Sequence, residues 1–369
     1  QATVSALIGA NELYNVCKFR VKGKTQAAPI AKVTAKKGEK VWILQYSVTR
    51  PQIDQRAIQN IEPFMSKYAY YMFTTNMPEN AEGCPFVNSK GEVIGLMQNN
   101  KTGDQVYSTD ANFVNDMTIS NGMAITNQVL KQSTIPVDFP ADQTQAAVML
   151  TLASEIGDTI MYPKYIHAFI RQFPNSIEGY SALATIQLGK ADFAAADATM
   201  QQAFQQVTKK DEIHSAYSRL IYNKVINFPD SIYPAWSSDK ALEEANTAYS
   251  LNKQPVYIHQ QALAHFIKKD YQIAYDKFIA LTGTKIRNGD LFYSAAQCKM
   301  QLNAPEETII ALIDSAIAAS PQPLNFVGAP YVLARATRYY NTGKFRQAVT
   351  DFNQYDSLMQ GRPINSDFY

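Results

Sequence analysis

The chain has 369 residues, 34 basic and 32 acidic side chains, and a formal net charge of +2. This length exceeds what one hydrophobic core usually supports, so we expect at least two structural units. A composition of 46% hydrophobic and 18% charged residues excludes a disordered chain. The small net charge gives no reason to expect nucleic acid as a partner, and the absence of a run of about eighteen apolar residues predicts no membrane span.

Residues 1–123 have the pattern of short strands separated by turns. The runs 41–48 and 68–74 are rich in β-branched and aromatic residues, which strands prefer. The tetrapeptide Asn88–Gly91 separates two apolar runs and predicts a hairpin, because Gly91 can adopt a positive φ. We expect this region to be all-β and to close into a small antiparallel barrel that protects its strand edges.

A change of pattern follows these strands. Residues 124–140 are predicted to be a linker, because Pro136 and Pro140 lie there among polar residues. From 141 to 369 the apolar residues recur with helical spacing, and strand-like alternation does not return.

The helical part repeats one pattern of apolar side chains. An aromatic residue is followed by Ala three positions on, a bulky apolar residue four further on, and another apolar residue three further on. A stripe with this spacing lies on one side of a helix, and a single hairpin cannot bury it, so the units are expected to stack. The three copies are Phe193, Ala196, Met200 and Ala203; Tyr271, Ala274, Phe278 and Leu281; and Phe345, Ala348, Phe352 and Tyr355.

These copies resemble the tetratricopeptide repeat, whose period is about 34 residues, and Gly343 matches the glycine between its two helices. We expect about six helical hairpins. Within 210–253, Pro229 and Trp236 predict a longer or distorted hairpin. The clear units are predicted at 176–209, 254–287 and 328–361, and the weaker ones at 143–175, 210–253 and 288–320.

In proteins of this family, the first helix of each unit lines a groove that holds a peptide or a helix of a partner. The resemblance therefore implies a protein or peptide ligand. The Lys and Asn residues of the family's carboxylate-clamp subtype are absent, which disfavours a chaperone C-terminus and favours a mixed apolar and aromatic groove. We expect half of the groove candidates to be buried against neighbouring units. The candidates are Ser181, Thr185, Leu188, His259, Leu263, Phe266, Leu333, Thr337 and Tyr340.

Residues 82–96 read E-G-C-P-F-V-N-S-K-G-E-V-I-G-L. This run resembles the nucleophile segment of trypsin-like, HtrA-type serine peptidases, in which G-x-S-G-G-P-[LV]-V-N-x-x-G-E-V-I-G-I is typical. A looser match at 14–21 covers the strand with the catalytic aspartate, and the resemblance spans about residues 5–118. Position by position, the nucleophilic Ser falls on Glu82 and the Asp on Asn15.

Both of these replacements remove the chemistry of a serine peptidase, since a nucleophile needs a base and a carboxylate to orient it. No catalytic residue is therefore predicted in this chain. The four histidines, His167, His214, His259 and His265, all lie beyond residue 123. The alternative is a peptidase whose first barrel and catalytic His lie upstream of Gln1.

Two interpretations of this loop use its remaining reactive groups. Cys84 is either a nucleophile or a packed thiol. Against the first interpretation, Cys84 lies two positions after the one that aligns with the family's nucleophile, and no neighbouring cation is visible to stabilise its thiolate. Glu82 either occupies the former oxyanion site or is a surface glutamate. Cys17, Cys84 and Cys298 are odd in number and far apart, so we expect neither disulfides nor a metal site, and we expect all three thiols to be buried.

The sequence thus predicts an α+β multidomain protein. It has a degenerate trypsin-like β-barrel lobe at 1–123, the linker at 124–140, and tetratricopeptide-type repeats at 141–369. The leading hypothesis is a non-catalytic scaffold without cofactors that binds a protein or peptide. A periplasmic or secreted place in the bacterial cell envelope follows from the HtrA-type resemblance and from the start at Gln1, which we interpret as that of a trimmed product. A third hypothesis makes the β lobe a cap that stabilises one end of the repeats.

Overall fold

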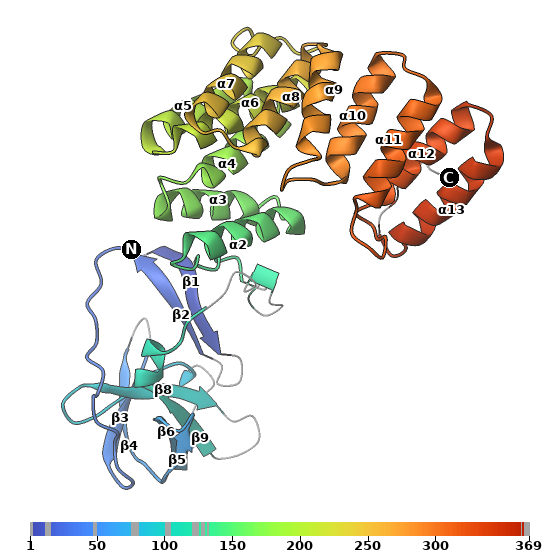
Figure 1. Ribbon diagram of the computed structural model, residues 1–369. Coiled ribbons are helices and arrows are strands. Elements are labelled where there is room, and N and C mark those ends of the chain that lie inside the picture. Colours follow the sequence, from blue (N-terminus) through green and yellow to red (C-terminus); the bar gives the residue numbers. More distant parts are fainter. Residues whose placement is uncertain are drawn as a thin grey trace. The chain divides into compact units, whose positions relative to one another are not determined.

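The computed structural model describes residues 3–11, 16–46, 50–74, 81–99, 105–119, 125–126, 130, 133–362 and 364. The chain divides into two compact units, Gln1–Gln172 and Phe173–Tyr369. Within the described residues, strands occur in the first unit and helices in both (Figure 1). The units divide inside the helical part, whereas the predicted domain boundaries follow the change from strands to helices and stay a prediction.

The first unit contains a seven-stranded antiparallel sheet and a separate two-stranded ribbon. The ribbon pairs β1 (Thr3–Asn11) with β2 (Val16–Lys22). The sheet consists of β3 (Lys40–Gln45), β4 (Gln52–Ala57), β5 (Asn60–Phe64), β6 (Tyr68–Thr74), β7 (Pro85–Val87), β8 (Val93–Asn99) and β9 (Gln105–Asp110). Its strand order is β4-β3-β7-β8-β9-β6-β5. A short 3-10 helix, η2 (Ala111–Asn115), follows β9.

The end strands of this sheet do not close it into a barrel. Although β4 and β5 lie at opposite ends of the strand order, only Ile58 and Gln59 separate them in the chain. Ile58 donates its N–H to Glu39 O beside β3, while Gln59 donates its N–H to Met72 O in β6. The sheet therefore curls, yet β4 and β5 run end to end and form no ladder among the described residues. The predicted closed barrel is wrong, because β4 pairs with β3 and β5 pairs with β6, and no ladder joins β4 to β5 in the described sheet.

The predicted strands and hairpin of the sheet are confirmed at β3, β6, β7 and β8. Gly91 has a φ of +75° in the turn between β7 and β8. The Asn88 side chain supports this turn by accepting hydrogen bonds from the N–H groups of Lys90 and Glu92, at 2.9 and 3.0 Å. The core beneath is apolar, and Phe73 and Phe86 stack there with their ring centroids 4.2 Å apart.

All six predicted helical hairpins are present. The hairpin at 210–253 is longer than the others, as predicted, since α6 has 18 residues and a ten-residue connector follows it. Each hairpin after the first lies in the second unit. The hairpins are α2 (Gln143–Ile156) with α3 (Met161–Gln172), α4 (Ile177–Gly189) with α5 (Phe193–Gln206), α6 (Lys210–Asn227) with α7 (Ser238–Leu251), α8 (Pro255–Ile267) with α9 (Tyr271–Leu281), α10 (Gly289–Gln301) with α11 (Glu306–Ala318), and α12 (Ala329–Asn341) with α13 (Phe345–Met359).

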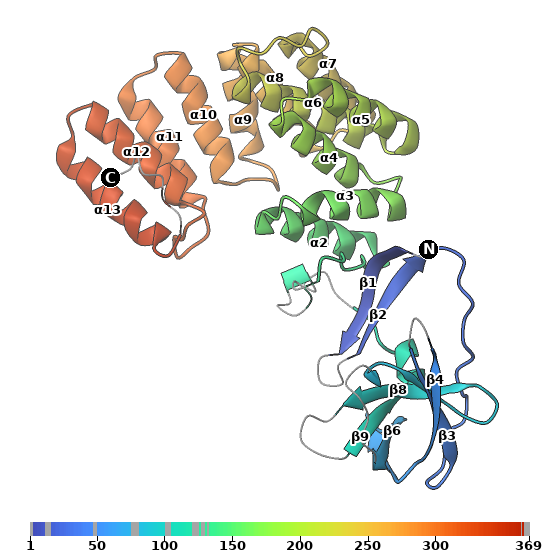
Figure 2. The same ribbon diagram turned by 180° about the vertical axis from the view of Figure 1, so that it is seen from behind.

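Successive hairpins of the second unit contact one another and lie side by side (Figure 2). They bury most of the repeated stripe, while Phe193, Tyr271 and Phe352 are partly buried. Small side chains stand where helices approach most closely, which lets the backbones pack. Phe345 is the exception in the stripe and is 60% exposed, because it lies in the last hairpin of the described chain. The fully buried alanines include Ala184, Ala262 and Ala336 of the first helices and Ala196 and Ala274 of the second helices.

Candidate functional site

The peptidase-like loop leads into β7. Glu82 is exposed there, whereas Cys84 is 2% exposed and belongs to the core of the sheet. The packed-thiol interpretation of Cys84 is therefore confirmed. Asn15, the position of the family's aspartate, lies outside the described residues. The trypsin-like character of this lobe stays a prediction.

The other two cysteines differ from each other. Cys298 is buried in α10, as expected, and burial raises the pKa of its thiol to about 12. Cys17 is exposed, so the expectation that all three thiols are buried is wrong. Cys17 lies between Val16 and Lys18 in the two-stranded ribbon, where every second side chain faces away from the strand's packed side. No cluster of three or more potential metal ligands occurs in the part of the chain that the structure describes.

Three first helices of the second unit lie next to one another. Helix α4 contacts α6, and α6 contacts α8, so their outward sides adjoin one another. We call this surface the first-helix face and define it by Ser181, Thr185, Arg219, Asn223 and His259. Two of the predicted groove positions on α4 and one on α8 thus belong to a single face.

The nine groove candidates are mostly open to solvent. Only Leu188 is buried, while Thr185, Thr337 and Tyr340 are exposed and the other five are partly exposed. The expectation that half of them are buried is wrong, because the stacking uses the neighbouring alanines instead. Leu333, Thr337 and Tyr340 lie on α12, where the Tyr340 ring meets Phe345 at 5.8 Å between centroids. Whether the nine bind a ligand stays a prediction.

A small pocket opens between α4 and α6. Its polar lining consists of Ser181 and Thr185 from α4 and Arg219 and Asn223 from α6, and its volume is about 10 Å³. The sequence did not single out the two residues of α6, because residues 210–253 depart from the repeat pattern. The sequence did contain one signal for them: Arg219 and Asn223 are four residues apart, as are Ser181 and Thr185, and this spacing places both members of a pair on one side of a helix.

Arg219 is unusual in its surroundings. Its side chain is exposed, and yet the surrounding protein lowers the pKa of the guanidinium by removing part of its hydration. Both observations fit a residue on the wall of a depression, which is open to water but flanked by protein. Burial and the nearby Arg219 also lower the pKa of His259, although Asp290 acts in the opposite direction. His259 is therefore neutral near pH 7, and Arg219 is the cation of this face.

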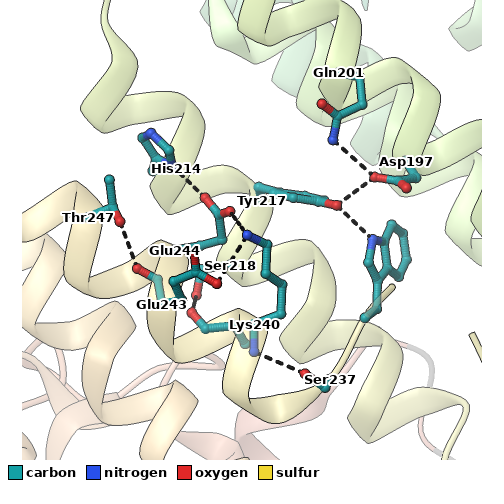
Figure 3. Close-up of polar contacts among 12 residues, drawn as sticks. Asp197, Gln201, His214, Tyr217, Ser218, Ser237, Lys240, Glu243, Glu244 and Thr247 are labelled. Carbon is teal, nitrogen blue, oxygen red and sulfur yellow. Dashed lines mark hydrogen bonds and ion pairs between the residues drawn. The ribbon is translucent and has the colours of Figure 1, made fainter. Parts of the chain in front are cut away.

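A polar network joins α6 to α7 (Figure 3). The buried Glu244 carboxylate bonds His214 Nδ1 at 2.5 Å and Lys240 Nζ at 2.9 Å. Burial acts to raise the pKa of Glu244, but these two hydrogen bonds outweigh it and lower that pKa. The carboxylate is thus held ionised, and it fixes one side of α6.

A second set of contacts joins α6 to α5 and to the connector before α7. The Tyr217 hydroxyl donates to Asp197 Oδ1 at 2.5 Å and accepts from Trp236 Nε1 at 3.1 Å (Figure 3). Burial, with the hydrogen bond to Asp197, raises the pKa of Tyr217, which stays protonated. Helix α6 is therefore held from both sides while it carries Arg219.

No family model matches the chain, and no curated protein matches it. Solved structures similar to it include helical-repeat proteins. A tetratricopeptide repeat protein from Parabacteroides merdae has a TM-score of 0.45 and 12% identity, with 66% of this chain and 84% of that chain covered. PilF from Pseudomonas aeruginosa has a TM-score of 0.41 and 13% identity, with 59% of this chain and 92% of that chain covered. A thermophilic tetratricopeptide repeat protein from Thermus thermophilus has a TM-score of 0.44 and 11% identity, with 54% of this chain and 100% of that chain covered. No described helix is both long and apolar enough to cross a membrane.

Proposed function

We propose that this chain is a non-catalytic scaffold that binds a protein or an extended peptide on the first-helix face. One observation carries the proposal: eight of the nine groove candidates keep solvent exposure although the hairpins have already buried their apolar stripe. Leu263, Phe266 and Leu333 also pack partly against the helical core, but the remaining surface of each is open to a ligand. Recognition by the first helices of stacked hairpins is the use to which such a surface is suited.

The proposal extends to the β lobe, which we regard as an inactive relative of the trypsin-like peptidases. Its support is the pair Glu82 and Cys84, of which the first replaces the nucleophile and the second is buried in the sheet core. The proposed location, a bacterial cell envelope, has its support in the HtrA-type resemblance of this lobe. Hydrolysis of fluorescent casein tests the inactivity: turnover by the full chain that Glu82→Ala abolishes would contradict it.

Binding is tested by selecting random peptides against the full chain. A length of about eight residues suffices, because three helices packed roughly 8–10 Å apart span what about six to eight extended residues cover at ~3.3 Å each. Thr185 is exposed on the first-helix face, and Gln205 is exposed on α5. We expect Thr185→Glu to weaken the selected peptides and Gln205→Glu to leave them unchanged. Equal effects of the two variants, or no selected peptide at all, would contradict the proposed face.

A further inference from the structure

Arg219 is set apart from the other arginines of the described second unit. Arg335 and Arg338 form ion pairs, Arg287 bonds a carbonyl, and Arg362 lies over a ring. The side chain of Arg219, like that of Arg346, makes no hydrogen bond, ion pair or ring contact within the described residues. At Arg219 the surrounding protein removes part of the hydration of the guanidinium and thereby lowers its pKa. A charge that is partly dehydrated and unpaired costs free energy, which an anionic ligand would offset.

The neighbours of Arg219 in the pocket are also unpaired donors. The Ser181 hydroxyl is buried and has no hydrogen-bond partner among the residues described. In the same part of the chain, the Asn223 side chain forms no hydrogen bond either. The Thr185 hydroxyl, by contrast, donates to Ser181 O at 2.7 Å. A guanidinium, an amide and a hydroxyl therefore meet in one pocket, and together they call for an acceptor with negative charge.

The pocket's size and position narrow the chemistry of that acceptor. A volume of about 10 Å³ is roughly the room of one water molecule, so the pocket admits one oxygen atom of a bound group. Arg219 lies on the middle helix of three, with Ser181 on α4 to one side and His259 on α8 to the other. A bound segment that crosses the face therefore continues past Arg219 in both directions.

We propose that the pocket formed by Ser181, Arg219 and Asn223 binds the carboxylate of an Asp or Glu side chain within an extended partner segment. This inference rests on the proposed function and adds the chemistry of the partner. The planar guanidinium fits a carboxylate with two parallel hydrogen bonds, and the amide and the hydroxyl supply further donors. Rotation about the Cα–Cβ bond of Ser181 turns its hydroxyl toward the bound oxygen.

The peptides selected on the full chain provide the test. We expect them to share an Asp or Glu at one position, and replacement of this residue by Asn or Gln to weaken binding at least tenfold, or ~1.4 kcal/mol. Arg219→Gln should produce the same loss, and the two changes together should cost little more than either alone. Arg346→Gln is the matched control, because it removes an equally unpaired arginine from α13, and binding should not change.

The possible outcomes separate this inference from the proposed function. Peptides that respond to Thr185→Glu, but share no acidic residue and tolerate Arg219→Gln, would overturn the inference and leave the proposed function standing. Failure to select any peptide would overturn both. Binding that depends on the free C-terminal carboxylate, and is lost on its amidation, would assign the pocket to a chain end and overturn the side-chain assignment. Arg219→Gln removes no described bond, so unfolding of the variant does not obscure the comparison.

Discussion

Gln260 of α8 donates a hydrogen bond from Nε2 to the Oγ of Ser218 of α6, at 3.1 Å, and both side chains are buried. The same hydroxyl donates to Ala241 O of α7 at 2.7 Å, so one oxygen joins three helices. Arg219 directly follows Ser218, and His259 directly precedes Gln260. This bond therefore fixes the spacing between two residues of the first-helix face.

We expect Gln260→Met to lower the free energy of unfolding by about 1 kcal/mol, because a side chain of similar shape replaces the donor of one buried hydrogen bond. Urea unfolding can be followed by Trp236 fluorescence in a Trp42→Phe background, so that the signal reports on the second unit. The exposed Gln205 supplies the control, since Gln205→Met should change stability by less than about 0.5 kcal/mol. Equal changes in the free energy of unfolding for the two substitutions would show that the hydrogen bond from Gln260 to Ser218 does not stabilise the contact between the helices.

The Glu244 carboxylate predicts a pH dependence of stability. Its pKa is lower in the folded protein than the ordinary value of 4.5, so its contribution is present above that value and is lost as the pH falls through the folded pKa. Glu244→Gln should destabilise the protein by about 1–3 kcal/mol near pH 7. The difference from the wild type should shrink at acidic pH, and a difference that stays constant there would contradict the assignment.

Glu243 is the matched control for this experiment. It also bonds Lys240, at 3.2 Å, but its side chain is 67% exposed (Figure 3). Exposed ion pairs contribute little, so we expect Glu243→Gln to change stability by less than about 0.5 kcal/mol at any pH.

The turns between paired helices predict a gain and a loss of stability. Ala191 and Gly343 occupy the same position in two hairpins, with φ of +58° and +74°. Ala191→Gly should stabilise the second unit by about 0.5–1 kcal/mol, because left-handed backbone strains any residue with a Cβ. Gly343→Ala should cost a similar amount, since nothing within 4 Å would meet the new Cβ and only the backbone strain remains. Thermal unfolding measures both changes, and the same sign for the two would refute the explanation.

Arg335 and Asp351 form a two-pronged ion pair between α12 and α13, with N···O distances of 2.7 and 2.8 Å. Arg335→Met should destabilise the protein by about 2–4 kcal/mol, since it leaves the buried Asp351 carboxylate unpaired. Removing both charges, with Asp351→Leu added, should restore much of the loss. Asp314 also bonds Arg335 but is exposed, so Asp314→Asn should cost less than about 1 kcal/mol. Urea unfolding compares the variants, and strictly additive losses in the double variant would contradict this prediction.

The three thiols predict a simple labelling result. A thiol reagent should modify Cys17 rapidly in the native protein, whereas Cys84 and Cys298 should react only after unfolding. Counting the modified thiols by mass spectrometry checks this prediction. Rapid modification of a Cys17→Ser variant would show that one of the two buried thiols is accessible.

The helical hairpins were predictable because their signal is local. A stripe such as Phe193, Ala196 and Met200 repeats with the period of the helix, so the pattern alone indicates which side is buried. The turn at Gly91 was predictable for a similar reason, since a positive φ is a property of one residue. The strand order, in which β4 and β5 run end to end, was not predictable from the sequence, because it depends on pairings between distant segments.

The sequence by itself determined the six hairpins, the β-rich first region and the small alanines at the helix contacts. These features follow from side-chain size and periodicity over a few residues. Only the tertiary structure decided that Cys17 is exposed, that the sheet stays open, and that Arg219 shares a pocket with Ser181 and Asn223 in whose described lining no acidic residue occurs. The physical reason is that solvation and pairing of a charge depend on every side chain within a few ångströms, and three separate helices supply those neighbours.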